Sequence, residues 1–164
     1  MECLACFSET DQSIPMWAHY TDSHKGICLE FRLRPEDHSE DYPLPNKVIY
    51  SPIRPKITTR DILAFMNMAE LPDREHRSNK TFDALHLKKA DEWSYEKEWR
   101  VSARLGGQSQ YIKIPSISVS SIKFGVRADE EKIAEVLSRF GHRVPVYRAE
   151  LSKQNFDVHF KRLN

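Results

Sequence analysis

Few glycines and an absence of excess charge are the first constraints that this sequence places on function. Only 5 of its 164 residues are glycine, so glycine-rich loops that cradle phosphates are scarce. No Walker motif, G-x-S-x-G or H-E-x-x-H is present. The 25 lysines and arginines against 24 acidic residues give a net charge of +1. This balance argues against a strongly basic nucleic-acid-binding protein, although it leaves nucleic acid open as a partner.

Long hydrophobic runs and a secretory signal are also missing. The longest apolar run, residues 62–66, is far shorter than the roughly 20 residues that span a bilayer, so no membrane partner is expected. The first residues lack the basic and apolar regions of a signal peptide. The odd number of cysteines, which are Cys3, Cys6 and Cys28, indicates reduced thiols and a cytoplasmic protein.

What remains is the composition of a folded domain. Hydrophobic residues make up 40% and aromatic residues 10% of the chain, which is enough to form a core. The length predicts a single domain over residues 1–164. The hydrophobic patterns predict strands over 2–7, 27–33, 47–50, 95–102, 111–114, 119–126, 144–147 and 156–160, and helices over 14–20, 59–70, 78–90 and 129–140.

Two local details and the fold class follow from these patterns. We expect the strand over 2–7 to be buried, and Thr59 to cap the helix over 59–70. Strands and helices alternate too loosely for a doubly wound parallel fold. An α+β fold is therefore predicted, with a mostly antiparallel or mixed sheet and several flanking helices.

One spacing of cysteine and histidine fits a zinc finger. Cys3, Cys6, His19 and His24 match the formula C-x2-C-x12-H-x4-H, which alone is a loose criterion. Trp17 stands only two residues before His19, not at the more central position that an aromatic residue takes between the second Cys and the first His of a classical finger. A strand over 2–7 would also place the two cysteines on opposite faces. We therefore interpret the cysteines as buried and structural and predict no metal, while the zinc alternative stays open.

The first dense motif covers residues 16–26 and brings aromatic, basic and histidine side chains together. On a helical turn Met16, His19 and Tyr20 share one face. His19 then fits a general base or a donor that orients a ligand, and Trp17, Tyr20 and Lys25 are candidate ligand-binding residues. The alternative is structural, with Trp17 and Tyr20 as core anchors and His19 bonded to a backbone group.

The second dense motif covers residues 88–100. In a strand, Glu96, Glu98 and Arg100 share one face, which is costly to bury and so is either solvated or a polar site. Two neighbouring carboxylates can split their pKa values into one acid and one base. Arg100 suits a phosphate or a carboxylate, and Trp93 is a further candidate ligand-binding residue. The alternative is an exposed strand face with cross-strand ion pairs.

The same residues carry a resemblance to a known family. They are Cys6-Phe7-Ser8-Glu9, Met16-Trp17-Ala18-His19-Tyr20, His24-Lys25-Gly26, Glu30-Phe31, Val48, Tyr50, Lys89, Trp93 and Tyr95-Glu96-Lys97-Glu98-Trp99-Arg100. In this order the chain resembles the bacterial and phage domain-of-unknown-function family numbered 2971, over roughly residues 3–126. The resemblance gives the spacing from Cys6 to His24 a reason other than zinc.

The resemblance also carries expectations about biology. Relatives of the family resemble proteins of phage-resistance, or abortive-infection, systems, which implies a role in phage defence or as part of a toxin–antitoxin pair. Family members begin with a further Tyr-bearing strand and an Asn-Asp-Pro loop, and we expect this chain to lack that segment. If the segment supplies a site residue, the protein is inactive or is the binding remnant of an enzyme.

Three functions fit these observations. The first is a nucleotide-acting enzyme whose motifs resemble the layout of ADP-ribosyltransferase-like folds, with NAD as the implied cofactor. In it Glu98 or Glu96 binds the ribose hydroxyls, Trp17 or Tyr20 stacks the nicotinamide, and His19 or Arg100 holds a phosphate. The second is a nuclease that uses His19, Glu96 and Glu98, with or without a metal.

The third is a non-catalytic interaction module, such as an antitoxin or a phage antagonist. It would bind a protein partner through Trp17, Trp93 and Trp99. Both enzyme hypotheses require the two motifs to meet. In that case His19, Tyr20, Lys25, Glu96, Glu98 and Arg100 line one cleft.

Overall fold

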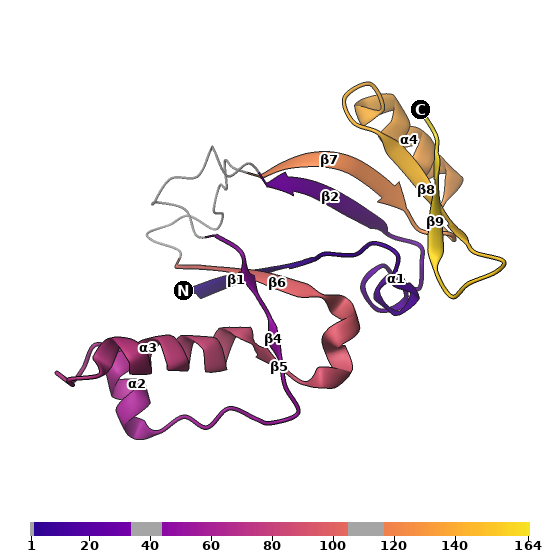
Figure 1. The fold of residues 1–164 in the computed structure, drawn as a ribbon. Helices are drawn as coiled ribbons and strands as arrows, with labels where there is room; N and C mark the ends of the chain where they lie inside the picture. The colour runs from indigo at the N-terminus through magenta and orange to yellow at the C-terminus, as the bar shows by residue number, and fades with distance from the viewer. Residues whose placement is uncertain (1, 34–43, 105–116) are drawn as a thin grey trace. The chain divides into compact units, whose positions relative to one another are not determined.

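The chain forms two compact units, each assembled from two separate segments. The computed structural model describes residues 2–33, 44–104 and 117–164. Unit 1 consists of Met1–Glu9 and Pro43–Ile112, and unit 2 of Thr10–Tyr42 and Lys113–Asn164. Helices and mixed or antiparallel sheets together confirm the predicted α+β class (Figure 1). The single domain predicted over residues 1–164 stays a prediction.

Unit 1 contains a three-stranded antiparallel sheet and a short parallel pair of strands. In the sheet, β6 (Glu98–Arg104) lies between β1 (Glu2–Ser8) and β3 (Asn46–Lys47). The parallel pair consists of β4 (Ile49–Tyr50) and β5 (Lys88–Lys89). The strand predicted over 47–50 is thus split between two sheets, because Val48 is buried between them and its N–H donates to the Glu98 carbonyl at 2.9 Å.

Strand β1 is confirmed as a strand, but the prediction that it is buried is wrong. The side chains of Leu4 and Cys6 are exposed. Within the described residues, β1 pairs with β6 alone and lies at the edge of its sheet. Apolar composition alone does not reveal whether another layer covers an edge strand. The prediction that the cysteines are buried is therefore also wrong for Cys6, whose side chain is exposed, while Cys28 is half-buried.

The strand predicted over 95–102 begins three residues later than expected. Residues Asp91–Glu96 form a 3-10 helix, η3, and Lys97 adopts the left-handed conformation with φ of 45°. A non-glycine residue at positive φ is uncommon, so nothing in the sequence pattern indicates this turn. Glu96 therefore ends a helix, and only Glu98 and Arg100 lie on β6.

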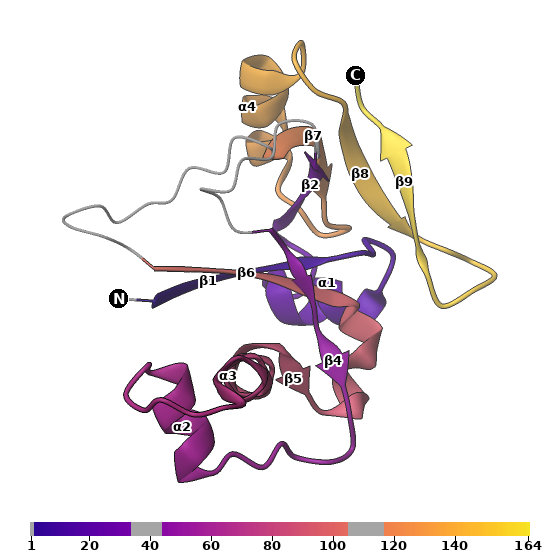
Figure 2. The same cartoon turned by 60° about the vertical axis from the view of Figure 1, so that its left-hand side comes forward.

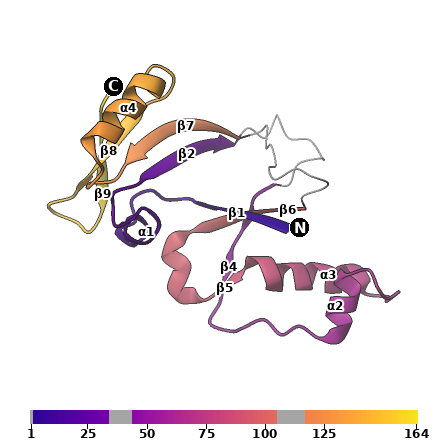
Figure 3. The ribbon, with the colours of Figure 1, turned by 180° about the vertical axis from the view of Figure 1, so that it is seen from behind.

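Two helices that lie side by side complete unit 1 (Figure 3). They are α2 (Thr59–Phe65) and α3 (Arg74–Phe82), and α3 continues into a π-helical turn, η2 (Asp83–Leu87), before β5. The helices predicted over 59–70 and 78–90 are therefore wrong at their ends. The first ends at Phe65, and the second begins and ends earlier because Lys88 turns to extended backbone.

A buried carboxylate connects these helices. Asp61 of α2 accepts hydrogen bonds from Arg77 at 2.8 Å and from Lys80 at 3.0 Å, both on α3. It also accepts from the backbone and hydroxyl of Thr58, which is the true N-cap in place of the predicted Thr59. The backbone N–H of Thr58, then its hydroxyl and Lys80, hold the pKa of Asp61 well below its usual range.

The capping box gives a paired test of this helix start. Thr58→Ala removes the side chain that caps the Asp61 N–H and should lower the free energy of unfolding by about 1 kcal/mol. Thr59→Ala, one position later and exposed, should have a clearly smaller effect. Urea unfolding followed by circular dichroism measures both. Equal losses would contradict the assignment of Thr58 as the cap.

Within the described residues, unit 2 is a four-stranded mixed sheet on which helices α1 (Ile14–Tyr20) and α4 (Glu130–Phe140) pack. The strand order is β2 (Ile27–Leu33), β7 (Ile117–Phe124), β8 (Val146–Leu151) and β9 (Val158–Arg162), with only the β7–β8 pair parallel. Helix α4 makes the crossover between β7 and β8, and Figure 2 shows the β8–β9 ribbon. The strands predicted over 119–126, 144–147 and 156–160 are each shifted by two residues at their start. The strand predicted over 111–114 lies outside the described residues.

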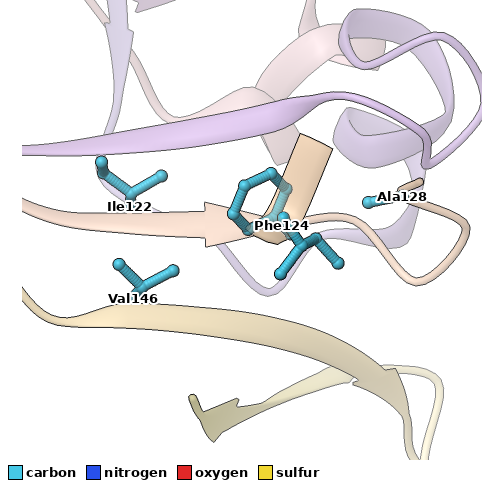
Figure 4. Close-up of a cluster of buried hydrophobic side chains, with 5 residues drawn as sticks. Ile122, Phe124, Ala128 and Val146 are labelled. Carbon is cyan, nitrogen blue, oxygen red and sulfur yellow. The ribbon is translucent and has the colours of Figure 1, made fainter. Parts of the chain in front are cut away.

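Two apolar clusters hold this sheet. Phe124 and Val146 from the parallel strands meet Ala128 (Figure 4). Ile133 of α4 belongs to the same cluster. The second cluster joins β8 and β9 to α1 through Trp17. No helix in the described part of the chain has the length and apolar character to cross a bilayer.

Candidate functional site

Four charged side chains of unit 1 converge at the junction of β5, η3 and β6. We call them the Lys89 network: Lys89, Glu96, Glu98 and Arg100. The Lys89 ammonium donates to the carboxylate of Glu96 and, at 2.8 Å, to Oε2 of Glu98. The turn at Lys97 separates the two glutamates onto different elements, yet both reach the same nitrogen. The sequence predicted that the glutamates and Arg100 lie together, but it did not identify Lys89 at their centre.

Arg100 holds Glu98 with two parallel hydrogen bonds. Its Nε donates to Oε1 of Glu98 at 2.7 Å, and its Nη2 donates to Oε2 at 3.0 Å. The remaining Nη1 donates to the carbonyl of His86 at 2.6 Å, which ties β6 to η2. This bidentate geometry fixes the guanidinium and the carboxylate relative to each other.

Side chains from β4 and β1, together with Trp93 of η3, fix the network's backbone and cation. The hydroxyl of Tyr50 accepts from the Glu98 N–H at 2.8 Å, and the hydroxyl of Ser8 donates to the Glu96 carbonyl at 2.6 Å. The ammonium of Lys89 lies 5.2 Å from the ring centroid of Trp93, a distance typical of a cation–π contact. The predicted ligand-binding residue Trp93 is therefore a neighbour of the network.

Both carboxylates of the network are buried, and Glu98 differs from an isolated buried acid because its pKa is lowered. Glu98 is 6% exposed and Glu96 is buried as well. Burial alone would raise the pKa of Glu98, but hydrogen bonds from Arg100, Lys89 and Cys6 lower it to about 2. Although the Cys6 side chain as a whole is exposed, partial desolvation of its thiol and the hydrogen bond to Glu98 raise the pKa of the thiol to about 11. At neutral pH, Glu98 is therefore a fixed anion beside a neutral thiol.

This shift in pKa has a consequence for acid stability. The pKa of Glu98 is lower in the folded protein, at about 2, than its ordinary value of 4.5. The folded state thus favours the ionised carboxylate. The stability that Glu98 contributes is complete above its ordinary pKa and is lost as the pH falls through about 2.

The first motif lies in unit 2, where it forms α1 and the turn that follows. Trp17 is 2% exposed, packs against Phe160 and donates from its indole nitrogen to the Asp11 carbonyl at 2.6 Å. This burial favours the core-anchor interpretation of Trp17. His19 and Tyr20 are exposed, and their ring centroids lie 6.5 Å apart.

The turn after α1 has an unusual backbone. Asp22, Ser23 and His24 all have positive φ, at 47°, 53° and 69°. The predicted ligand-binding residue Lys25 follows them and pairs with Asp22 at 3.4 Å on the surface. A Cβ on Gly125 would come within 2.1 Å of the His24 carbonyl oxygen. Glycine at position 125 is therefore required for this turn to lie against the end of β7.

The first motif belongs to unit 2 and the second motif to unit 1. The single cleft lined by His19, Tyr20, Lys25, Glu96, Glu98 and Arg100 stays a prediction. Among the residues that the structure describes, no three His, Cys, Asp or Glu side chains are placed to hold a metal ion. The side chain of Cys3, part of the zinc-finger spacing, lies outside that set.

A pocket of about 610 Å³ opens in unit 1 next to the Lys89 network. It lies between the loop over 51–57 and the segment over 84–92. Its lining is Ser51, Pro52, Ile53, Arg54, Pro55, Ile57, Ala84, Leu85, Lys88, Lys89, Ala90 and Glu92. Lys89 is thus shared between the network and the pocket. Arg54, Lys88 and Lys89 were not predicted as site residues, although the pair of lysines at the start of the second motif is a signal that could have indicated two of them.

Comparisons with known proteins identify a family and nothing more specific. No curated protein and no solved structure matches the chain. A family model described as "Protein of unknown function (DUF2971)" matches residues 16–101, which include the first motif and the whole of the second. The match covers more than half of the chain, although residues 6–9 of the resemblance lie outside it. The chain therefore belongs to the DUF2971 family, as its motifs indicated.

Proposed function

We propose that this protein binds a nucleotide and acts on it as an NAD-consuming, ADP-ribosyltransferase-like enzyme. The observation that supports the proposal most is the position of Lys89, whose ammonium contacts both buried glutamates while its side chain lines the pocket. A ligand in the pocket would thus lie next to a fixed carboxylate. Phage defence is the biological setting that we propose with it.

Transfer of ADP-ribose requires stabilisation of a positively charged sugar. The bond between the ribose C1′ and the nicotinamide nitrogen breaks, and its electron pair leaves with nicotinamide, so C1′ becomes oxocarbenium-like before a nucleophile attacks it. A preorganised anion that needs no reorientation lowers the energy of this state. Glu98 fits that role, because Arg100 holds both of its oxygens and its low pKa keeps it ionised.

One observation favours the interaction module as a second candidate. Glu98 accepts two hydrogen bonds from Arg100, one from Lys89 and one from Cys6, which together occupy the usual capacity of a carboxylate. A fully satisfied network of this kind also serves to hold β5, η3 and β6 together. In that case the pocket or the exposed aromatic side chains bind a partner without turnover.

Release of nicotinamide from NAD tests the proposal. The wild-type protein should release nicotinamide, and Glu98→Gln, which keeps the shape but removes the charge, should not. Glu9→Gln is the matched control and should release nicotinamide like the wild type. Glu9 also pairs with a lysine, Lys47 at 3.0 Å, but at an exposed position outside the Lys89 network.

Thermal shift with NAD, ADP-ribose and a short oligonucleotide separates the alternatives. Saturable binding at 100 times Kd adds about 2.7 kcal/mol to the free energy of unfolding. Binding of NAD without release of nicotinamide would contradict the enzymatic proposal and favour the interaction module. A shift with the oligonucleotide alone would favour the nuclease hypothesis.

A further inference from the structure

We infer that the pocket between residues 51–57 and 84–92 is a binding site for the diphosphate and base of a nucleotide, with Arg54 and Lys88 as its anion-binding residues. This inference deepens the proposed function and rests on it for the choice of a nucleotide. The pocket of about 610 Å³ falls within the range of roughly 300–1,000 Å³ that is usual for small-molecule sites.

The charges on the pocket wall favour an anion. Lys89 is matched by Glu96 and Glu98. Arg54 and Lys88, in contrast, form no ion pair with any other residue in the described part of the chain, and neither does Glu92 on the same wall. Two unmatched cations against one unmatched carboxylate leave the wall with one positive charge in excess.

Placement of the two cations adds to this argument. Arg54 belongs to a loop with prolines at positions 52 and 55, and Lys88 belongs to β5, which pairs with β4. Proline limits the backbone freedom of such a loop, so less entropy is lost when the guanidinium binds. An arginine fork and a lysine point charge are the donors that proteins commonly use for phosphate groups.

The apolar part of the wall offers a surface for a base. Ile53 is 74% exposed and Leu85 is 56% exposed, and both line the same pocket with Pro52 and Pro55. Here large, highly exposed aliphatic side chains lie beside cations that form no ion pair within the described residues. This combination suits a ligand with a flat apolar face and a charged end. A nucleoside diphosphate has both features, whereas inorganic pyrophosphate has only the charge and adenosine only the base.

Calorimetric titration of the full chain with ADP, pyrophosphate and adenosine tests this assignment. Arg54→Gln and Lys88→Gln should each weaken ADP binding about tenfold or more, the usual effect of losing a hydrogen bond to a charged group. Glu92→Gln should strengthen it. Lys56→Gln is the matched control, since Lys56 is exposed two residues from Arg54 and is not among the lining residues. It should bind ADP like the wild type.

Several outcomes would overturn the inference. The inference is wrong if ADP does not bind, or if pyrophosphate binds as tightly as ADP. It is also wrong if Lys56→Gln weakens ADP binding as much as Arg54→Gln does, or if Glu92→Gln weakens it. The result is separable from the enzymatic proposal. ADP binding with the expected dependence on Arg54 and Lys88, but no nicotinamide release from NAD, would uphold this site and reject the reaction. If the protein releases nicotinamide from NAD and neither Arg54→Gln nor Lys88→Gln changes the release, the reaction is upheld and this binding site is rejected.

Discussion

Replacing Glu98 by alanine should lower the free energy of unfolding by about 3 kcal/mol, which is the lower end of the range for breaking a buried ion pair. The substitution removes the shared partner of Lys89 and Arg100 and leaves two cations facing each other across a cavity. Their side chains are 20% and 14% exposed, so water reaches them in part and moderates the loss. Urea unfolding followed by circular dichroism at neutral pH measures the effect.

Two comparisons show whether the loss comes from the buried charge. Glu9→Ala also removes a carboxylate that pairs with a lysine in unit 1, but at an exposed position, and it should leave the unfolding midpoint nearly unchanged. The wild type should lose stability as the pH falls below 4.5 toward the Glu98 pKa of about 2, and Glu98→Gln should lose less over the same interval. A Glu98→Ala protein as stable as Glu9→Ala would contradict the structural role of the network.

Replacing Phe124 by alanine should lower the free energy of unfolding by about 3–5 kcal/mol. Phe124 lies at the end of β7, is 2% exposed and belongs to the apolar cluster under α4. Its neighbours Val146 and Ile133 come from different elements, a strand and a helix, so they cannot close the resulting cavity without moving the crossover. The same unfolding measurement applies.

Phe156 provides the matched control for Phe124. It is fully exposed in the connection between β8 and β9, so Phe156→Ala deletes the same atoms without creating a cavity. Its effect should stay within about 0.5 kcal/mol. Similar losses in the two variants would contradict the assignment of Phe124 to the core of unit 2.

Much of the local structure of unit 2 was predictable because its apolar residues follow regular periods. The sequence of β2 alternates apolar and polar residues, although its pairing with β7 shifts register between Glu30 and Phe31. Helix α4 carries a clear apolar stripe, begins after Asp129, which caps it, and is followed by Gly141. In unit 1 the patterns failed where the backbone leaves regular geometry. The left-handed Lys97 and the π-helical turn after Phe82 depend on tertiary contacts, and no residue type at those positions signals them.

The candidate site was predictable only as far as it is local in sequence. Glu96, Glu98 and Arg100 lie within five positions of one another, so their proximity was expected from the sequence, although Glu96 ends η3 instead of continuing the strand. Lys89 joins them because β5 pairs with β4, which brings Tyr50 opposite Lys89. Arg54 reaches the pocket through a loop between proline residues. The positions of Lys89 and Arg54 depend on contacts between segments that are distant in sequence, and hydrophobic periodicity does not predict such contacts.

The pairing of β1 with β6 has a consequence for the newly made chain. Ser8 lies opposite Glu98 and Glu2 opposite Arg104, so roughly ninety residues separate the partners. Ribosomes add about 5–20 residues each second, which leaves β1 unpaired for on the order of ten seconds after its synthesis. During that interval Leu4, Cys6 and Phe7 form an extended apolar segment with open backbone groups, which is a natural binding site for chaperones that recognise unfolded chains.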